Sequence, residues 1–243
     1  MTPVSSSRLH DVVIAGAGPV GLFLACELAL AGRDVVVLER DAQPDAPLKR
    51  APLGLRGLSV ATGEALHRRG LLDELHAAAG AAFAPGPAPA GHFGGIDIDP
   101  ARVDPSRWTW RLPGPVAANF AADIASVEAV LCARAVALGV ELRRGCAVTA
   151  VADAGEAVSV HAGAHVVRGR WLVGCDGGRS AVRRLAGFEF PGTEPEFTAY
   201  SALAEITQPS PLPPGRHATD AGFFVNEPGR IAIADFDGGG FDR

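Results

Sequence analysis

The apolar positions at the start of the chain predict a strand, a helix and a second strand. Residues 11–15 form a short run rich in β-branched side chains, which is typical of a buried parallel strand. A nearly continuous apolar stretch then begins at about Pro19 and ends at Gly32, which predicts a helix between these two residues. Residues 35–38 form the second β-branched run. The sequence therefore predicts a βαβ unit, preceded by a loose polar lead at residues 1–10.

Farther along the chain, the pattern predicts further helices and two groups of strands. Leucines at helical spacing predict a helix over residues 62–80, and a longer pattern predicts another over residues 123–138. The first group of strands comprises residues 140–142, 148–151, 158–161, 165–168 and a run that begins at Trp171 and ends in Asp176 and Gly177. The second group comprises residues 93–112, 197–206, 222–226 and 231–236, with a proline-rich connection at residues 208–215.

These elements divide the chain into two predicted domains. One is a discontinuous nucleotide-binding domain of residues 1–82 and 115–188, and the other is an incomplete β-sheet domain of residues 83–114 and 189–243. The expected fold class is α/β, with a mainly parallel sheet in the first domain and an antiparallel sheet in the second. A ligand should lie between the domains, at the carboxyl ends of the parallel strands.

The turn after the first predicted strand has the sequence of a dinucleotide-binding loop. Gly16 allows a sharp turn, Gly18 leaves room for a diphosphate beside the backbone, and Gly21 allows close packing of the helix on the strand. The first helical turn, at Pro19, offers N–H groups without intrahelical partners to an anion. Glu39 ends the second strand near the spacing of about 20 positions expected for an acid that binds ribose hydroxyls. A carboxylate there would repel a 2′-phosphate, so the loop predicts FAD or NAD rather than NADP; a βαβ unit with an empty crevice is the alternative.

Composition narrows the class of protein. The 243 residues carry a net charge of −5 with a pI near 5.8, which gives no sign of a nucleic-acid or membrane-surface partner. Asp11 and Glu27 interrupt the apolar start, which argues against a secretory signal or a membrane span. The four cysteines and seven histidines are scattered without metal-ligand spacing. We therefore expect no metal site, and the cysteines are interpreted as buried thiols in a reducing cytoplasm.

A second glycine–acid motif follows a later predicted strand. Asp176 ends that strand, Gly177 allows a turn and Ser180 can cap the next helix, although an ordinary strand-to-helix turn would look the same. Together with the first motif, Cys175-Asp176-Gly177 followed by Ser180 and Arg183 resembles the FAD-dependent aromatic monooxygenases of the p-hydroxybenzoate hydroxylase type.

The resemblance covers nearly the whole chain. The segments Arg68-Arg69-Gly70-Leu71-Leu72, Gly91-His92-Phe93 and Leu185-Ala186-Gly187-Phe188 look closest to the branch that hydroxylates polycyclic polyketides. The resemblance implies a glutathione-reductase-like, three-layer FAD domain joined to part of a β-sheet substrate domain. It also implies hydroxylation of an aromatic ring with O2 and NAD(P)H through a flavin C4a-hydroperoxide. Such chemistry requires no protein nucleophile, and no catalytic residue is assigned.

The resemblance also implies a place around FAD for particular residues. Glu39 would hold the adenosine ribose, and Arg40 would flank the adenine. Arg50 would lie near the flavin, and Asp176 would lie near the diphosphate and the path of the nicotinamide co-substrate. Residues of the first turn would surround the diphosphate: Gly16, Gly18, Pro19 and Gly21.

The sequence departs from the family's pattern at two places. The family has a third motif, a Gly-Asp before a turn into a helix, and Asp237-Gly238 near the end of the chain does not replace it. We therefore expect an N-terminal part of a longer enzyme, with the remainder cleaved, disordered or supplied by another chain. Many relatives also place a glutamine about four or five residues before Glu128, where this chain has Ile124 and Asp123.

Several alternatives to a polyketide hydroxylase stay open. An antibiotic-inactivating flavin monooxygenase would differ in substrate, and a truncated FAD-binding module would bind without turnover. An NAD-dependent dehydrogenase would need an acid or base near the nicotinamide, and no His or Lys is placed for that role. Trp108 and Trp110 echo a motif of flavin-dependent halogenases, but they are interpreted as aromatic residues on one face of a strand.

Overall fold

The computed structural model divides the chain into two compact units, Met1–Phe190 and Pro191–Arg243. In the first unit it describes residues 4–44, 46–51, 53–79, 119–163 and 165–190, with the short pieces 92–93, 96–97, 102, 104–107 and 114–116. In the second unit it describes residues 191–194, 215–219, 222–227 and 230–235. The discontinuous domain division expected from the sequence stays a prediction.

A six-stranded sheet with the order β7-β2-β1-β10-β9-β8 organises the first unit. Strand β1 (Val4–Ala15) pairs in parallel with β2 (Val35–Leu38) and with β10 (His165–Gly174), and β2 pairs in parallel with β7 (Glu141–Arg143). The antiparallel strands β9 (Val158–Ala162) and β8 (Val148–Asp153) complete the sheet. The sheet is mainly parallel, which confirms the predicted α/β fold class.

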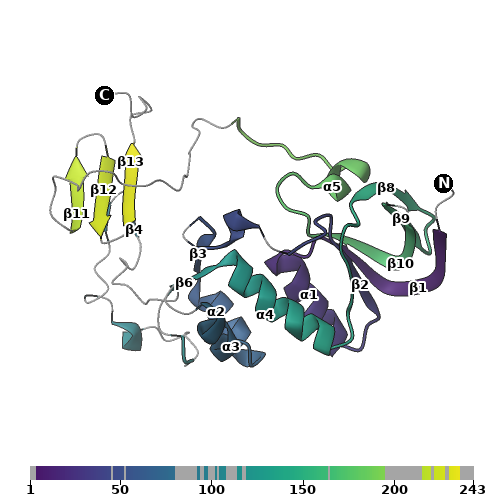
Figure 1. The fold of residues 1–243 in the computed structure, drawn as a ribbon, viewed down its shortest axis with the longest axis horizontal. Coiled ribbons are helices and arrows are strands. Elements are labelled where there is room, and N and C mark those ends of the chain that lie inside the picture. The colour runs from purple at the N-terminus through teal and green to yellow at the C-terminus, as the bar shows by residue number, and fades with distance from the viewer. Residues whose placement is uncertain are drawn as a thin grey trace. The chain divides into compact units, whose positions relative to one another are not determined.

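Alternate side chains of the central strands enter two separate cores. On one face, Ile14 packs with residues of α1 (Pro19–Leu30) and α4 (Ile124–Ala137), which lie side by side in Figure 1. On the other face, Val13 packs with Val160 of the β8-β9-β10 meander, and neither side chain has exposed surface. Because both faces of the sheet are covered there, β2 and the last four residues of β1 are apolar without alternation.

The helices differ from the prediction between residues 60 and 80. The structure has two helices, α2 (Val60–Arg68) and α3 (Leu72–Ala79), where the leucine spacing predicted one helix over residues 62–80. Gly70 lies between them with a φ of +69°, a left-handed conformation that ends a helix. The remaining described elements of this unit are short: the 3-10 helix η1 (Pro47–Lys49), β3 (Leu55–Leu58), β4 (His92–Phe93), β5 (Ile96–Asp97), the 3-10 helix η4 (Pro105–Arg107), β6 (Phe120–Asp123) and α5 (Ala181–Leu185).

Two strand predictions were wrong in extent. Residues 4–10, predicted as a loose lead, belong to β1, because the first half of β10 pairs with them from Val4 onward. Strand β10 is continuous where the sequence predicted two strands. The charged residues Arg168 and Arg170 interrupt the apolar pattern there without interrupting the strand.

The second unit contains a three-stranded antiparallel sheet. Its strands are β11 (Gly215–Thr219), β12 (Gly222–Glu227) and β13 (Arg230–Asp235). The last two agree with the strands predicted near these positions, whereas β11 was missed because its sequence lacks apolar alternation.

Some predicted features fall on residues that the structure does not describe. They are the strand at residues 197–206 and most of the run at residues 93–112, including Trp108 and Trp110.

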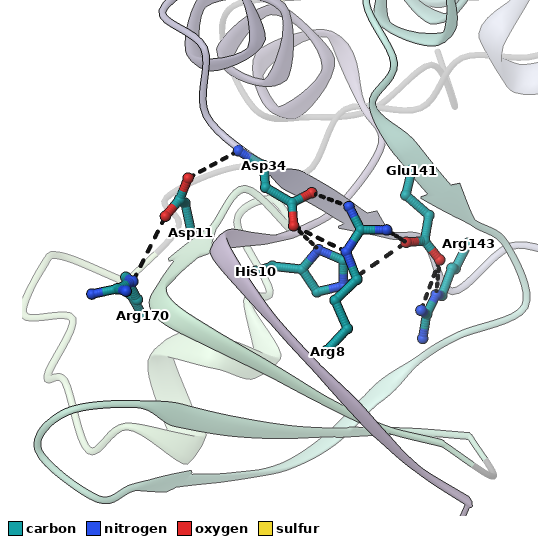
Figure 2. Close-up of polar contacts among 7 residues, drawn as sticks. All are labelled: Arg8, His10, Asp11, Asp34, Glu141, Arg143 and Arg170. Atoms are coloured by element: carbon teal, nitrogen blue, oxygen red, sulfur yellow. Dashed lines mark hydrogen bonds and ion pairs between the residues drawn. The ribbon is translucent and has the colours of Figure 1, made fainter.

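Seven polar side chains form a network at the amino ends of the parallel strands (Figure 2). Asp34, which directly precedes β2, receives Nη2 and Nε of Arg8 at 2.7 and 3.1 Å. The side chain of His10 is completely buried, with Nδ1 3.2 Å from Oδ2 of Asp34 and Nε2 3.8 Å from Oε2 of Glu141. The network thus joins β1 to the beginnings of β2 and β7.

Two further arginines and one acid extend this amino-end network. Arg143 lies 2.7 Å from Oε1 of Glu141. Asp11 accepts the backbone N–H of Asp34 at 3.0 Å and lies 3.7 Å from Nε of Arg170. Each carboxylate of the network therefore faces at least one cation.

The described residues include no helix long and apolar enough to cross a membrane. In the same ranges, no group of three or more His, Cys, Asp or Glu side chains is arranged to hold a metal ion. All four cysteines are free thiols.

Candidate functional site

The carboxyl ends of the parallel strands place the two glycine–acid motifs side by side. Gly16, after β1, donates its N–H to the carbonyl of Leu38 at 2.7 Å, and Cys175, after β10, donates to the carbonyl of Ala15 at 2.8 Å. Glu39, after β2, donates to the carbonyl of Arg143 at 2.8 Å. Residues far apart in the sequence therefore meet along one edge of the sheet, which we call the carboxyl edge.

The first glycine turn is shaped by the second motif. Gly16 has a φ of +103°, and a Cβ on it would overlap the backbone carbonyl of Cys175. A Cβ on Gly21 would overlap the carbonyl of Gly16 and lie 3.2 Å from Cβ of Cys175. Both positions therefore require glycine because three backbone segments cross there.

Gly18 has a different environment from its two neighbours in the motif. It is the N-cap of α1 with an extended backbone, no side chain caps the helix, and Pro19 occupies the first helical turn. Within 4 Å of a Cβ on Gly18, the one atom found is Oε1 of Glu128, at 3.9 Å. The helix therefore presents unpaired N–H groups beside backbone with little around it, which suits a bound anion.

Glu39 is a buried carboxylate that closes the glycine turn from the β2 side. It is 9% exposed, its Oε2 accepts the N–H of Ala17 at 2.7 Å, and its Oε1 accepts the N–H of Asp41 at 2.9 Å. Each oxygen has a second lone pair, so the carboxylate can still accept a hydroxyl group. The adjacent Arg40 is exposed, with Nε 3.6 Å from Oδ1 of Asp41.

Lys49 and Glu128 form an ion pair at the same edge. Nζ of Lys49 lies 2.8 Å from Oε2 of Glu128, whose side chain comes from the first half of α4 and is 8% exposed. Burial raises the pKa of Glu128 above its ordinary value of 4.5, and Lys49 opposes this effect without cancelling it. The pair therefore places one buried negative charge next to Gly18, balanced by one cation.

The segment that carries Lys49 and Arg50 is fastened to the start of α4. The N–H of Ala51 binds Oδ2 of Asp123 at 3.0 Å, while Oδ1 of Asp123 accepts the N–H of Ser126 at 2.8 Å and caps the helix. A Cβ on Gly54 would overlap the backbone of Lys49, so the chain folds back closely there. Asp123 thus has a structural role in this chain.

The carboxylate of Asp176 is directed toward the following helix. It accepts the hydroxyl of Ser180 at 2.5 Å and the N–H groups of Ala181 and Val182 at 2.6 and 3.2 Å. Burial favours a higher pKa, but these hydrogen bonds outweigh it and lower the pKa of Asp176. The backbone of Asp176, rather than its carboxylate, lies against Gly16.

The structure brings most of the predicted residues together and adds two. Gly16, Gly18, Gly21 and Glu39 line the carboxyl edge, whereas sequence reasoning assigned no role to Lys49 or Glu128. Two signals could have identified the pair. Lys49 is the only lysine among 22 lysine and arginine residues, and Glu128 is an acid within an otherwise apolar part of its helix.

Comparison with known proteins identifies a matching family and several similar proteins named as monooxygenases. A family model described as an FAD binding domain matches residues 10–233. A Claviceps purpurea protein named as a monooxygenase is 43% identical over 96% of this chain and 47% of its own length. A Streptomyces rimosus enzyme, 12-dehydrotetracycline 5-monooxygenase/anhydrotetracycline 6-monooxygenase, is 40% identical over 83% of this chain and 37% of its own length.

A solved structure gives a similar result. The Diels-Alderase of pyrroindomycin biosynthesis superposes with a TM-score of 0.68 at 33% identity, over 94% of this chain and 47% of that one. The chain thus spans about half the length, or less, of the proteins it matches. Because the family model covers nearly all of the sequence, the chain belongs to the FAD binding domain family.

Proposed function

We propose that this chain holds the adenine dinucleotide part of FAD in a flavin-dependent aromatic hydroxylase. The observation that carries the proposal is the family match over residues 10–233, together with a glycine turn, an uncapped helix start and Glu39 at one sheet edge. The named monooxygenases among the relatives support the redox chemistry, and the tetracycline enzyme supports a polycyclic polyketide as substrate.

The residues at the carboxyl edge fit the adenosine diphosphate part of FAD. The diphosphate would lie over Gly18 and the first turn of α1, between Gly16 and Gly21, where N–H groups point outward and a Cβ is missing. Glu39 would accept the ribose hydroxyls with its remaining lone pairs. The other residues assigned by resemblance keep their proposed places: Pro19 at the diphosphate, Arg40 at the adenine, Arg50 near the flavin, and Asp176, through its backbone, near the diphosphate.

The proposed reaction consumes O2 and NAD(P)H. One oxygen atom of O2 enters the aromatic ring as a hydroxyl group, the other leaves as water, and NAD(P)H is oxidised to NAD(P)⁺. FAD, when bound, supplies the electron transfer and the activation of O2. The protein's part is to bind the dinucleotide, orient the ring and keep water away from the reacting atoms.

A titration of the purified chain with FAD tests the first part of the proposal. We expect quenching of flavin fluorescence that saturates at one FAD per chain. The second part is tested by NAD(P)H oxidation that an aromatic polyketide stimulates, with a product heavier by one oxygen atom. Saturable FAD or ADP binding without any turnover would instead identify a binding module, and absence of binding would overturn the proposal.

The similarity to a Diels-Alderase favours a second candidate function, a cyclisation without net redox change. In that case a polyene substrate would be converted to a product of the same mass, and no NAD(P)H or O2 would be consumed. An antibiotic-inactivating monooxygenase would be recognised by hydroxylation of an added antibiotic. Mass spectrometry of the products therefore separates the three possibilities.

A further inference from the structure

The Lys49–Glu128 pair has a feature that a purely structural ion pair would not need. Oε1 of Glu128 lies 3.9 Å from the position of a Cβ on Gly18, and its Oε2 is bound by Lys49 at 2.8 Å. The carboxylate therefore directs one oxygen toward the turn and the other toward the lysine. A buried negative charge is unfavourable here, because a diphosphate bound over Gly18 would also be anionic and the two would repel each other.

The other charges around Glu128 do not remove this problem. Glu39, at the end of β2, is a second carboxylate whose charge raises the pKa of Glu128. Arg144, which follows β7, acts in the opposite direction but more weakly than Lys49. Lys49 thus supplies the largest share of the positive charge that offsets Glu128.

We propose that Lys49 is a positioning residue that neutralises Glu128 and so permits an anionic diphosphate to bind over Gly18. This proposal rests on the proposed binding of FAD. In the absence of Lys49, the ligand would meet an unbalanced carboxylate with little water to screen it.

The proposal predicts a particular order of affinities in a double-mutant cycle. Lys49→Met should raise the Kd for FAD about tenfold or more at pH 8, because Glu128 remains charged. Glu128→Gln should bind FAD at least as tightly as the wild type, since it removes the repulsion and leaves Lys49 free to face the phosphates. The double variant should recover most of the affinity that Lys49→Met loses. Isothermal titration calorimetry on the whole chain measures each Kd.

A series of ligands shows whether phosphate charge is the cause. The loss caused by Lys49→Met should be absent for adenosine, small for AMP and largest for ADP and FAD. It should also shrink as the pH is lowered toward the ordinary carboxyl range, because the raised pKa of Glu128 favours its neutral form there. A loss that is equal for adenosine and ADP would overturn the proposal.

Matched variants separate this charge effect from a loss of structure. Arg69→Met breaks the Arg69–Glu27 ion pair, which has an N–O distance of 2.6 Å and joins α1 to the residue after α2, and it should leave FAD binding unchanged. Lys49→Arg should retain affinity, and circular dichroism checks the fold of every variant.

If Glu128→Gln weakens FAD binding as much as Lys49→Met does, the pair only stabilises the structure and the proposal is wrong. If the wild-type chain binds neither ADP nor FAD, the proposed function itself fails; if it binds and Lys49→Met binds equally well, only this inference fails.

Discussion

The acidic side chains at the two ends of the parallel sheet have different kinds of partner. At the amino ends, Asp34 and Glu141 face the guanidinium groups of Arg8 and Arg143, with the buried His10 beside them (Figure 2). At the carboxyl edge, Glu39 and Asp176 are instead held by backbone N–H groups and a serine hydroxyl. Ion pairs between side chains dominate the amino ends, whereas at the carboxyl edge Glu39 and Asp176 order the backbone and the Lys49–Glu128 pair is the exception.

This difference follows from the geometry of parallel strands. The chain leaves each strand at the carboxyl edge and begins a turn or helix there, so free N–H groups accumulate at that end. Acids that bind those groups order the turns and keep lone pairs for a ligand. At the amino ends the backbone N–H of Asp34 binds Asp11, and arginines supply most of the opposing charge. We therefore expect substitutions at the carboxyl edge to affect the backbone turns and ligand binding, and those at the amino ends to affect stability alone.

The strongest test of the carboxyl edge is the substitution Gly16→Ala. An alanine there must adopt a φ near +103° and also overlap the carbonyl of Cys175. We expect a loss of about 2–4 kcal/mol in the free energy of unfolding, because strain and overlap add. Urea unfolding followed by circular dichroism measures this loss.

Gly177→Ala is the matched control for that substitution. Gly177 also has a positive φ, +83°, but no atom lies within 4 Å of its Cβ position. Conformational strain alone should cost about 1 kcal/mol. If both variants lost the same stability, the close crossing of the two motifs would not be what requires a glycine at position 16.

A smaller effect, but one specific to the ligand, is expected for Glu39→Ala. This change removes the acceptor of the Ala17 and Asp41 N–H groups and of the proposed ribose hydroxyls. We expect FAD affinity to fall about 10- to 100-fold, equivalent to about 1–3 kcal/mol. Fluorescence titration measures the affinity, with Glu39→Gln giving an intermediate value because it keeps one acceptor oxygen.

Asp34→Asn is the control for Glu39 from the other end of the sheet. Its side chain faces Arg8 and His10 and is remote from the glycine turn, so FAD affinity should not change. A loss of affinity in this variant as large as that in Glu39→Ala would remove the distinction between the two ends.

The carboxyl edge was more predictable from sequence than the amino ends, for a physical reason. Gly16, Gly18 and Gly21 act within a single turn, and Glu39 follows the next strand, so local spacing describes their arrangement. The helix α4 and the strand β2 were likewise predicted from local sequence patterns. The structure added that Gly16 is also required by Cys175, a contact between segments that no local pattern contains.

The features missed from the sequence depend on partners distant in the chain. Lys49 and Glu128 are 79 positions apart, and Arg8 and Asp34 are 26 apart, so neither pair has a recognisable spacing. Residues 4–10 look like a polar lead because their strand exists through pairing with β10. The break at Gly70 was missed for another reason. The helical spacing of the leucines continues across this residue, but its left-handed backbone ends the helix.

Glu128 at the carboxyl edge and Asp34 at the amino ends should respond to pH with opposite signs, and Glu128 gives the first case. Its folded-state pKa is raised above 4.5, chiefly by burial, so the folded chain binds a proton more readily than the unfolded chain. Stability should therefore fall as the pH rises from about 4.5 through the raised pKa, and Glu128→Gln should abolish this part of the fall. Thermal unfolding across that range measures it, and an unchanged slope in the variant would contradict the assignment.

Asp34 gives the opposite case and the smallest expected effect. Burial alone would raise its pKa, but the hydrogen bonds from Arg8 and the nearby His10 imidazole lower it below the ordinary 3.8. The unfolded chain therefore binds the proton more readily, so this contribution is present above that value and is lost as the pH falls through the lowered pKa. Arg8 is 61% exposed, which limits the pair to about 1 kcal/mol or less. Asp34→Asn should lose less stability than the wild type between about pH 5 and pH 2, and equal losses would show that water screens the pair completely.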